Sequence, residues 1–137
     1  MHLKLFLCFL LLLPAVSGNC LDDYKALSIF IERLRRYIDD NFEYVCDQAS
    51  RDAIIQYMIK YLEELFYRLQ HPCLVTFNPQ PFSSSCPDLD AVNNSKLFLV
   101  LQEIDLRLDS LCNNGCPMDM SQFLQTVLED IEYLKTL

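Results

Sequence analysis

The stretch LCNNGCPMDMSQFLQTVLEDIEYLKTL, residues 111–137, carries the strongest fold signal in the chain. An Asn-Asn-Gly sequence, which typically ends a helix, separates Cys112 from Cys116. After Pro117 apolar residues recur at steps of three and four, the spacing of an amphipathic helix. These residues are Phe123, Leu124, Val127, Leu128, Ile131 and Leu134. The stretch therefore predicts a terminal helix with a covalent anchor just before it.

The first eighteen residues have the composition of a secretory signal peptide. Lys4 belongs to a short basic start, residues 5–13 are mostly apolar, and residues 16–18 supply the small side chains of a cleavage site. The apolar run is too short to favour a membrane span, and no later stretch is long enough. We therefore expect a signal peptide at 1–18 and one secreted, extracellular domain at 19–137, without membrane insertion.

The net charge bears on the expected partners, and the cysteine content bears on the expected disulfides. The formal net charge is −8, and it becomes −9 when Lys4 is removed with the signal peptide. Such an acidic chain argues against nucleic acid and anionic membranes as partners. Six cysteines remain, which in an oxidising compartment favours three disulfides but leaves 15 connectivities open. They are Cys20, Cys46, Cys73, Cys86, Cys112 and Cys116.

The mature chain lacks the residues of the common catalytic sites. Only one histidine, His71, and one glycine, Gly115, follow the signal peptide. A histidine beside Pro72 is more typical of a helix end than of a catalytic triad, and one glycine cannot build a phosphate-binding loop. No second ligand pair completes a zinc site with Cys112 and Cys116. We expect no enzyme activity, no metal site and no cofactor.

Three further apolar stripes precede the terminal helix and predict helices over about 21–40, 50–71 and 97–111. Ser50 is the expected N-cap of the second of these helices, and Asp119 with Gln122 resembles a capping box before the last helix. Four amphipathic helices without strand alternation predict an all-α, disulfide-stapled four-helix bundle. The expected core residues of the first three helices are Tyr24, Leu27, Ile31, Leu34, Ile38, Ile55, Met58, Leu62, Leu65, Leu69, Leu97, Leu101, Ile104, Leu108 and Leu111.

The connection from Cys73 to Asp90 is rich in proline and serine, so we expect a loop there. The cysteines that bracket it, Cys73 and Cys86, are expected to pair with each other. Asn93-Asn94-Ser95 is an acceptor sequence for N-glycosylation at Asn93, which in a secreted protein lies at the surface.

Two of the four predicted helices resemble those of the short-chain helical cytokines. Cys112 and Cys116 followed by Phe123-Leu124-Gln125-Thr126 are similar to the start of the last helix in the interleukin-2, -15 and -21 group. Residues 31–40, IERLRRYIDD, resemble the first helix of that group. The resemblance implies a secreted cytokine that binds and activates an immune or haematopoietic cytokine receptor on the cell surface. It also implies that the first and last helices lie side by side and meet receptor chains with their outer faces.

The resemblance places the receptor contacts on polar residues of these two helices. Glu132 occupies the position of a family glutamine that contacts the shared gamma receptor chain. Because a carboxylate accepts hydrogen bonds but cannot donate them, this exchange puts the use of that chain in question. The expected receptor-binding residues are Glu32, Arg33, Arg36, Gln125 and Glu132. Glu32 and Arg36 are also spaced for an ion pair within the first helix.

The order of the helices in space remains open. The family runs up-up-down-down, which needs long first and third connections. Here the long connection is the second one, so an up-down-up-down order is the alternative.

Other functions remain open beside the interleukin resemblance. Residues 101–108, running into Cys112, also resemble the third helix of macrophage colony-stimulating factor. That resemblance implies a Cys20–Cys112 disulfide and a dimeric ligand of a receptor tyrosine kinase, so the protein is either a monomer or a homodimer. The main alternative from another class is a secreted helical carrier of an apolar ligand, which would enclose a cavity of a few hundred Å³. A secreted inhibitor or decoy with the cytokine fold is a third possibility.

Overall fold

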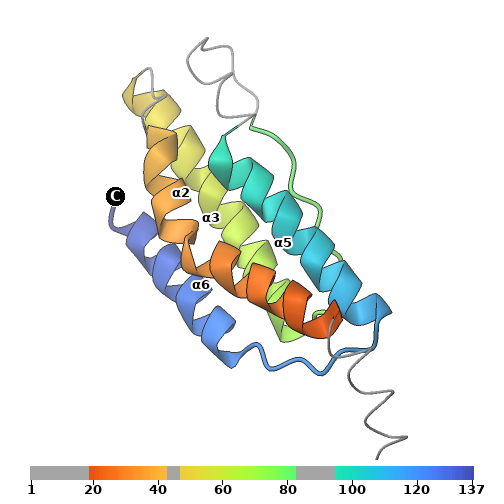
Figure 1. The fold of residues 1–137 in the computed structure, drawn as a ribbon. Helices are drawn as coiled ribbons and strands as arrows, with labels where there is room; N and C mark the ends of the chain where they lie inside the picture. Colours follow the sequence, from red (N-terminus) through yellow and green to blue (C-terminus); the bar gives the residue numbers. More distant parts are fainter. Residues whose placement is uncertain (1–18, 43–46, 83–94) are drawn as a thin grey trace, which may run out of the picture.

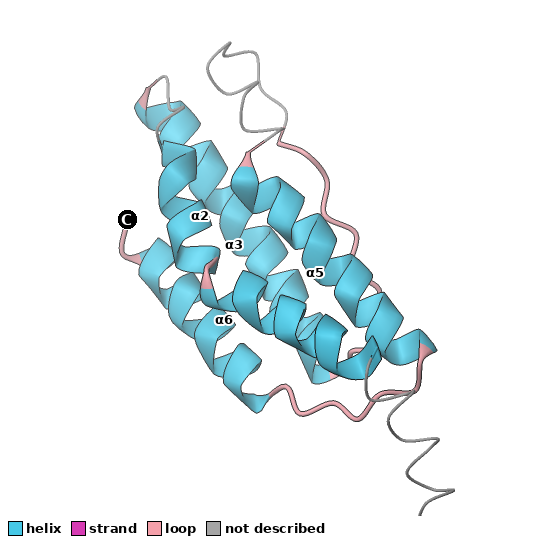
Figure 2. Cartoon of the chain, viewed as in Figure 1, coloured by secondary structure: helices cyan, strands magenta, loops and turns pink. Residues whose placement is uncertain are grey.

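Apolar side chains at helical spacing build an all-helical structure (Figure 1). The computed structural model describes residues 19–42, 47–82 and 95–137. Within these ranges there are five helices and no strand (Figure 2). The helices are residues 19–32, α2 (Leu34–Asn41), α3 (Gln48–Gln70), α5 (Lys96–Asn113) and α6 (Ser121–Lys135).

The helix predicted over 21–40 is interrupted at Arg33. The backbone there has φ −97° and ψ 3°, and the Arg33 N–H is shared between the carbonyls of Ile29 and Phe30, at 3.2 and 3.3 Å. The chain changes direction at this point (Figure 1). The apolar stripe nevertheless continues across the break, because Ile31 and Leu34 are both fully buried.

Two disulfides tie the helix ends together and correct the expected pairing. Cys20 bonds to Cys116, with 5.6 Å between their Cα atoms, and Cys73 bonds to Cys112, with 5.5 Å. The expected pairing of Cys73 with Cys86 was therefore wrong, as was the Cys20–Cys112 bond implied by the colony-stimulating-factor resemblance. The physical reason is that α3 and α5 end at the same level, which brings Cys73 beside Cys112.

Several predictions lie outside the described residues. They are the signal peptide at 1–18, Cys46, Cys86 and the glycosylation acceptor Asn93.

The contacts between helix ends also fix the helix directions. Residues 19–32 with α2 run parallel to α6, because Tyr24 contacts the start of α6 and Asp39 contacts its end. The helices α3 and α5 run the opposite way (Figure 1). This order is neither up-up-down-down nor up-down-up-down.

Residues 71–82 let α3 and α5 run in the same direction, because they carry the chain back along these helices. The Tyr57 hydroxyl on α3 donates to the carbonyl of Gln80 at 2.8 Å, and the Tyr57 ring lies 5.3 Å from the ring of Phe82. Phe77 and Phe82 are buried, so this segment covers part of the core. The loop predicted from Cys73 to Asp90 is confirmed as non-helical for its described residues, 73–82.

The core confirms most of the predicted stripes. Of the residues expected there, all are buried except Tyr24 and Leu124, which are half-buried, and Leu128, which is 41% exposed. The prediction of Leu128 as a core residue was therefore wrong. The most deeply buried side chains include Leu27, Ile31, Leu34, Ile38, Ile54, Met58, Leu62, Leu65, Leu69, Leu97 and Leu101.

The helix caps differ from those expected. Asp47, not Ser50, caps α3, because its carboxylate accepts the Ser50 N–H at 2.8 Å. Asp119 lies before the N-cap of α6 and accepts the Ser121 N–H at 3.1 Å, so no capping box with Gln122 forms. At α3 the acidic side chain of Asp47 lies one turn before Ser50 and accepts one of the free N–H groups at the helix start.

Candidate receptor-binding face

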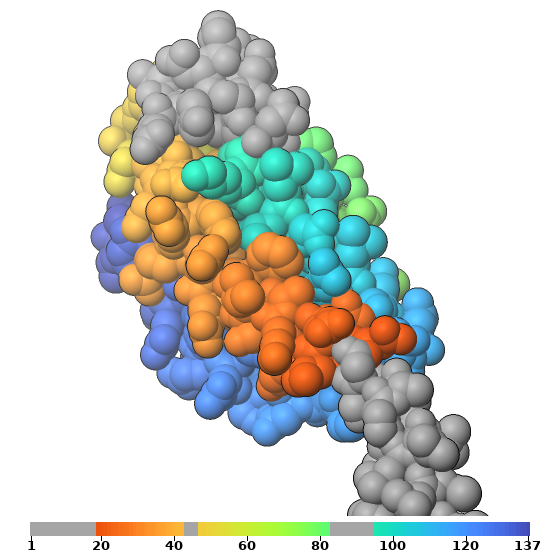
Figure 3. All heavy atoms as spheres, viewed as in Figure 1, coloured from red at the N-terminus to blue at the C-terminus, as the bar shows by residue number. Residues whose placement is uncertain are grey.

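The five residues expected to contact a receptor are all exposed. Glu32 ends the first helix, Arg33 lies at the break, and Arg36 is on α2, whereas Gln125 and Glu132 are on α6. Residues 19–42 lie between α5 and α6 on one face of the molecule (Figure 3). We call the outward residues of 19–42 and α6 the candidate receptor-binding face.

An exposed isoleucine lies among the charged residues of the first helix. Ile29 is 48% exposed and is separated by three, four and seven residues from Glu32, Arg33 and Arg36. At this spacing Glu32 shares one side of the first helix with Ile29, whereas Arg33 lies at the break and Arg36 lies beyond it on α2. An apolar side chain inside a charged rim is typical of the energetic centre of a protein interface. Sequence reasoning missed Ile29, although its position off the buried stripe was a signal.

A comparable residue lies on α6. Leu128 is exposed, with Gln125 three residues before it and Glu132 four residues after it. The Gln125 side chain donates to Glu129 at 3.3 Å, so its amide is partly engaged within the helix. Each group of expected contact residues therefore includes one exposed aliphatic side chain.

A cluster of four side chains, Arg35, Asp39, Asp130 and Tyr133, joins α2 to α6, and we call it the seam cluster. Arg35 Nε donates to Asp130 at 3.0 Å, and the Arg35 guanidinium carbon lies 3.9 Å from the centre of the Tyr133 ring. The Tyr133 hydroxyl donates to Asp39 at 2.7 Å. This register brings Arg36 level with Glu132, so residues from both helices that were expected to contact a receptor lie at the same end of the face.

Arg35 was not singled out from its neighbours in the sequence, yet its role differs from theirs. Arg33 and Arg36 are exposed, whereas Arg35 reaches Asp130, of which only 3% is exposed. No ion pair between Glu32 and Arg36 is among those formed by the described residues.

Burial raises the pKa of Asp130 to about 6, although the guanidinium of Arg35 opposes this shift. The nearby carboxylates of Glu129 and Asp39 raise the pKa further. The hydrogen bond to Asp39 likewise raises the pKa of the Tyr133 hydroxyl. The seam cluster thus holds a carboxyl group that titrates in mildly acidic solution.

We expect Asp130→Asn to change how stability depends on pH. The folded protein binds the Asp130 proton more tightly than the unfolded chain, so this group stabilises the fold below pH about 4, and the effect is lost as pH rises through about 6. A shift from 3.8 to about 6 corresponds to up to roughly 3 kcal/mol. The variant should therefore exceed the wild type in free energy of unfolding at pH 7 and approach it at pH 4.

Urea unfolding at pH 4, 5, 6 and 7 measures this difference. Asp23, whose pKa is lowered mainly by a hydrogen bond from Ser110, is common to both proteins, so the comparison isolates Asp130. Asp39→Asn is the matched control from the same cluster. A stability difference between wild type and Asp130→Asn that stays constant with pH would contradict the assignment.

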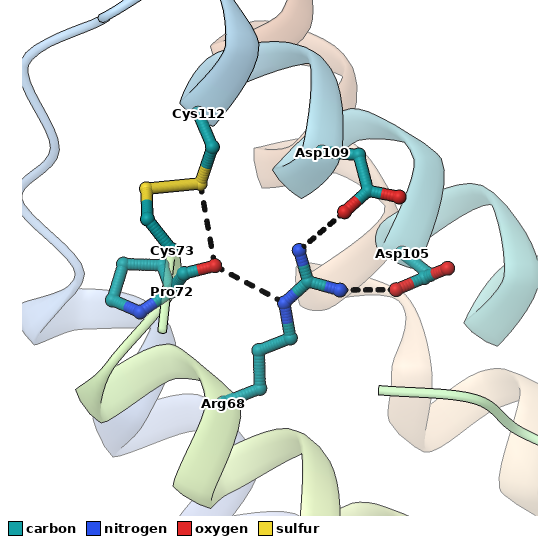
Figure 4. The surroundings of a disulfide bond; sticks show 6 residues. All are labelled: Arg68, Pro72, Cys73, Asp105, Asp109 and Cys112. Atoms are coloured by element: carbon teal, nitrogen blue, oxygen red, sulfur yellow. Dashed lines mark hydrogen bonds and ion pairs between the residues drawn. A yellow bond between two sulfur atoms is a disulfide. The ribbon is translucent and has the colours of Figure 1, made fainter. Parts of the chain in front are cut away.

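The most deeply buried cation, Arg68, lies at the other end of the molecule. Its guanidinium contacts Asp105 and donates to Asp109 at 2.8 Å, and its Nε donates to the Pro72 carbonyl at 3.2 Å (Figure 4). The Cys73–Cys112 disulfide lies directly beside this network (Figure 4). Because the guanidinium of Arg68 is engaged by these partners, the network joins α3 to α5 and leaves this cation little capacity to bind a ligand.

The hollows among the described residues are open to solvent. A hollow of about 230 Å³ lies between the first two helices and α5, lined by Phe30, Tyr37 and Leu99. Another of about 350 Å³ lies between residues 78–79 and the outer side of α5. Neither resembles the enclosed cavity that a carrier of an apolar ligand needs.

Two further features, a metal site and a membrane-spanning helix, are absent from the described residues. No group of three or more histidine, cysteine, aspartate or glutamate side chains in this part of the chain could hold a metal ion. Within the same residues, no helix has the length and apolar character needed to cross a membrane. Comparison of the whole chain with family descriptions, curated proteins and solved structures found no match.

Proposed function

We propose that the protein is a secreted signalling ligand with the short-chain cytokine type of four-helix bundle, in which residues 19–32 and α2 count as one interrupted helix. It acts by binding and activating a cytokine receptor at the cell surface through the candidate receptor-binding face. The disulfides and the helical architecture agree with this class, since small extracellular domains often depend on such cross-links. The parallel first and last helices would make it a variant in topology.

The observation that carries the proposal is the surroundings of Ile29. An aliphatic side chain that is 48% exposed, followed within seven residues by the exposed charges of Glu32, Arg33 and Arg36, has the composition of an apolar interface centre with a charged rim. The opposite side of the same helix is fully buried at Leu27 and Ile31. These outward side chains are therefore not needed to fill the core, and they are available to a partner.

Reversing the charge at Glu32 tests this proposal. Glu32→Arg should weaken binding to the cognate receptor ectodomain by more than about tenfold, because tenfold corresponds to only about 1.4 kcal/mol and a like charge would then face the receptor's complementary group. The measurement is surface plasmon resonance of the purified, oxidised protein against a panel of haematopoietic cytokine-receptor ectodomains. Wild-type binding in the nanomolar range is expected.

The matched control is Glu64→Arg, the same reversal at an exposed position of α3 outside the candidate receptor-binding face. It should leave binding within about twofold of wild type, because an exposed charge outside an interface contributes little. Equal loss in both variants would point to a general effect of charge and contradict the assigned face. Absence of binding to every receptor chain would contradict the proposed function.

A further inference from the structure

Asp130 is held in an unusual way for a buried carboxylate. Its Oδ1 accepts from Arg35 Nε at 3.0 Å, whereas its Oδ2 is buried and has no hydrogen-bond partner among the described residues. A buried charged oxygen without a partner is costly, and a proton on that oxygen removes much of the cost. The geometry therefore leaves a place for one proton inside the seam cluster.

The negative charges around Asp130 outnumber the positive ones. Arg35 and Asp39 face it from α2, and Glu129 and Tyr133 lie beside it on α6. From α3, Arg51 acts on Tyr133, the neighbour that binds Asp39. Three carboxylates thus lie near only two guanidinium groups. One added proton on Asp130 therefore reduces the repulsion between the carboxylates as well as the cost of burying a charge.

The chain around Arg35 has the freedom to move when Asp130 is protonated. The helix break at Arg33 lies two residues before it, and α2 is only eight residues long. The Arg35 side chain is 43% exposed, so its guanidinium can turn into water without unpacking the core. Leu34 and Ile38 keep α2 attached, because both are fully buried.

We propose that Arg35 and Asp130 form a proton-operated latch between α2 and α6. A proton from solvent adds to Oδ2 of Asp130 and makes the side chain a neutral acid. The ion pair becomes a weaker hydrogen bond to a neutral carboxyl group, Arg35 keeps only this bond and its contacts with the Tyr133 ring and the Glu129 carbonyl, and the polar contact between α2 and α6 loosens. The candidate receptor-binding face includes both helices, so mild acid changes the surface they present.

The pKa of about 6 for Asp130 supports this switch in mildly acidic solution. Tyr133 stays bound to Asp39 across this range because its hydroxyl, with a raised pKa, remains protonated. The latch therefore depends on one carboxyl group.

NMR of the isotope-labelled full domain tests the latch without any receptor, so its outcome is independent of the proposed function. The side-chain Nε–H of Arg35 is followed from pH 7.5 to 5.0, with its exchange rate expressed relative to free arginine at the same pH. The carboxyl carbon of Asp130 is titrated in the same samples. We expect at least a tenfold loss of Arg35 protection, with the midpoint near pH 6 that the carboxyl carbon also shows.

Two variants complete the test. Asp130→Asn should show low Arg35 protection at every pH, whereas Asp39→Asn should keep the transition with a lower midpoint, because Asp39 is one of the carboxylates that raise the pKa of Asp130. The proposed latch is contradicted if Arg35 protection does not change with pH, or if the Asp130 carboxyl titrates near pH 4. It is also contradicted if Asp130→Asn shows the same pH-dependent loss of Arg35 protection as the wild type. The wild-type titration alone decides between these outcomes if a variant does not fold.

Discussion

We expect Arg68→Ala to lower the free energy of unfolding by about 3–5 kcal/mol, the range found when one partner of a buried ion pair is removed. Arg68 is only 3% exposed, and its guanidinium satisfies Asp105, Asp109 and the Pro72 carbonyl. Burial already raises the pKa of Asp105, with Arg68 opposing the shift, so removal of Arg68 leaves that carboxylate poorly compensated. Urea unfolding at pH 7 measures the loss.

The matched control is Arg107→Ala on α5. Arg107 also pairs with a carboxylate from another helix, Asp23, at 3.0 Å, but its side chain is 38% exposed. The Asp23 side chain is only 11% exposed but keeps a hydrogen bond from Ser110, so the expected loss is smaller than for Arg68, about 1–2 kcal/mol. Equal losses in the two variants would show that burial does not govern the contribution of Arg68. The acidic partners of Arg68 should in addition make the Arg68→Ala defect smaller at pH 4 than at pH 7.

Removal of the Cys20–Cys116 disulfide should cost roughly 4–5 kcal/mol. The bond closes a loop with a sequence separation of 96, and the chain-entropy model gives about 4.7 kcal/mol for a loop of about this length. The variant Cys20→Ala with Cys116→Ala avoids a free thiol. Its free energy of unfolding is compared with that of the oxidised wild type, and peptide mapping of the wild type verifies the pairing.

The control is the corresponding double variant of Cys73 and Cys112, whose sequence separation is 39. The same entropy relation predicts a cost lower by roughly 0.8 kcal/mol. This bond also lies beside Arg68, so a larger loss than for Cys20–Cys116 would show that the network with Arg68 depends on it. Stability unchanged by loss of Cys20–Cys116 would contradict its expected role.

Apolar periodicity predicted the helices and most of their core because it is a local property. Met58 and Leu101 could be placed from their neighbours three and four residues away. The break at Arg33 could not, since no glycine or proline is present there and the interruption does not alter the buried stripe. The disulfide pairing could not be predicted for a different reason. It depends on where α3 ends relative to α5, and the lengths of the connections do not determine that.

The candidate site was less accessible from sequence than the fold. Glu32 and Arg36 are exposed as a polar face predicts, but Ile29 was missed because a single apolar residue off the stripe carries little weight in a pattern. Arg35 looks like Arg33 and Arg36 in sequence. Only the packing of α2 against α6 shows that Arg35 reaches a buried carboxylate.

The bond between Cys20 and Cys116 has a consequence for the timing of maturation. Cys116 is synthesised 96 residues after Cys20, so this cross-link cannot form until the nascent chain has grown by that length. The contacts of the first helix with α6 must likewise wait until α6 has been synthesised. This cross-link and these contacts therefore form only after the other described helices have been synthesised.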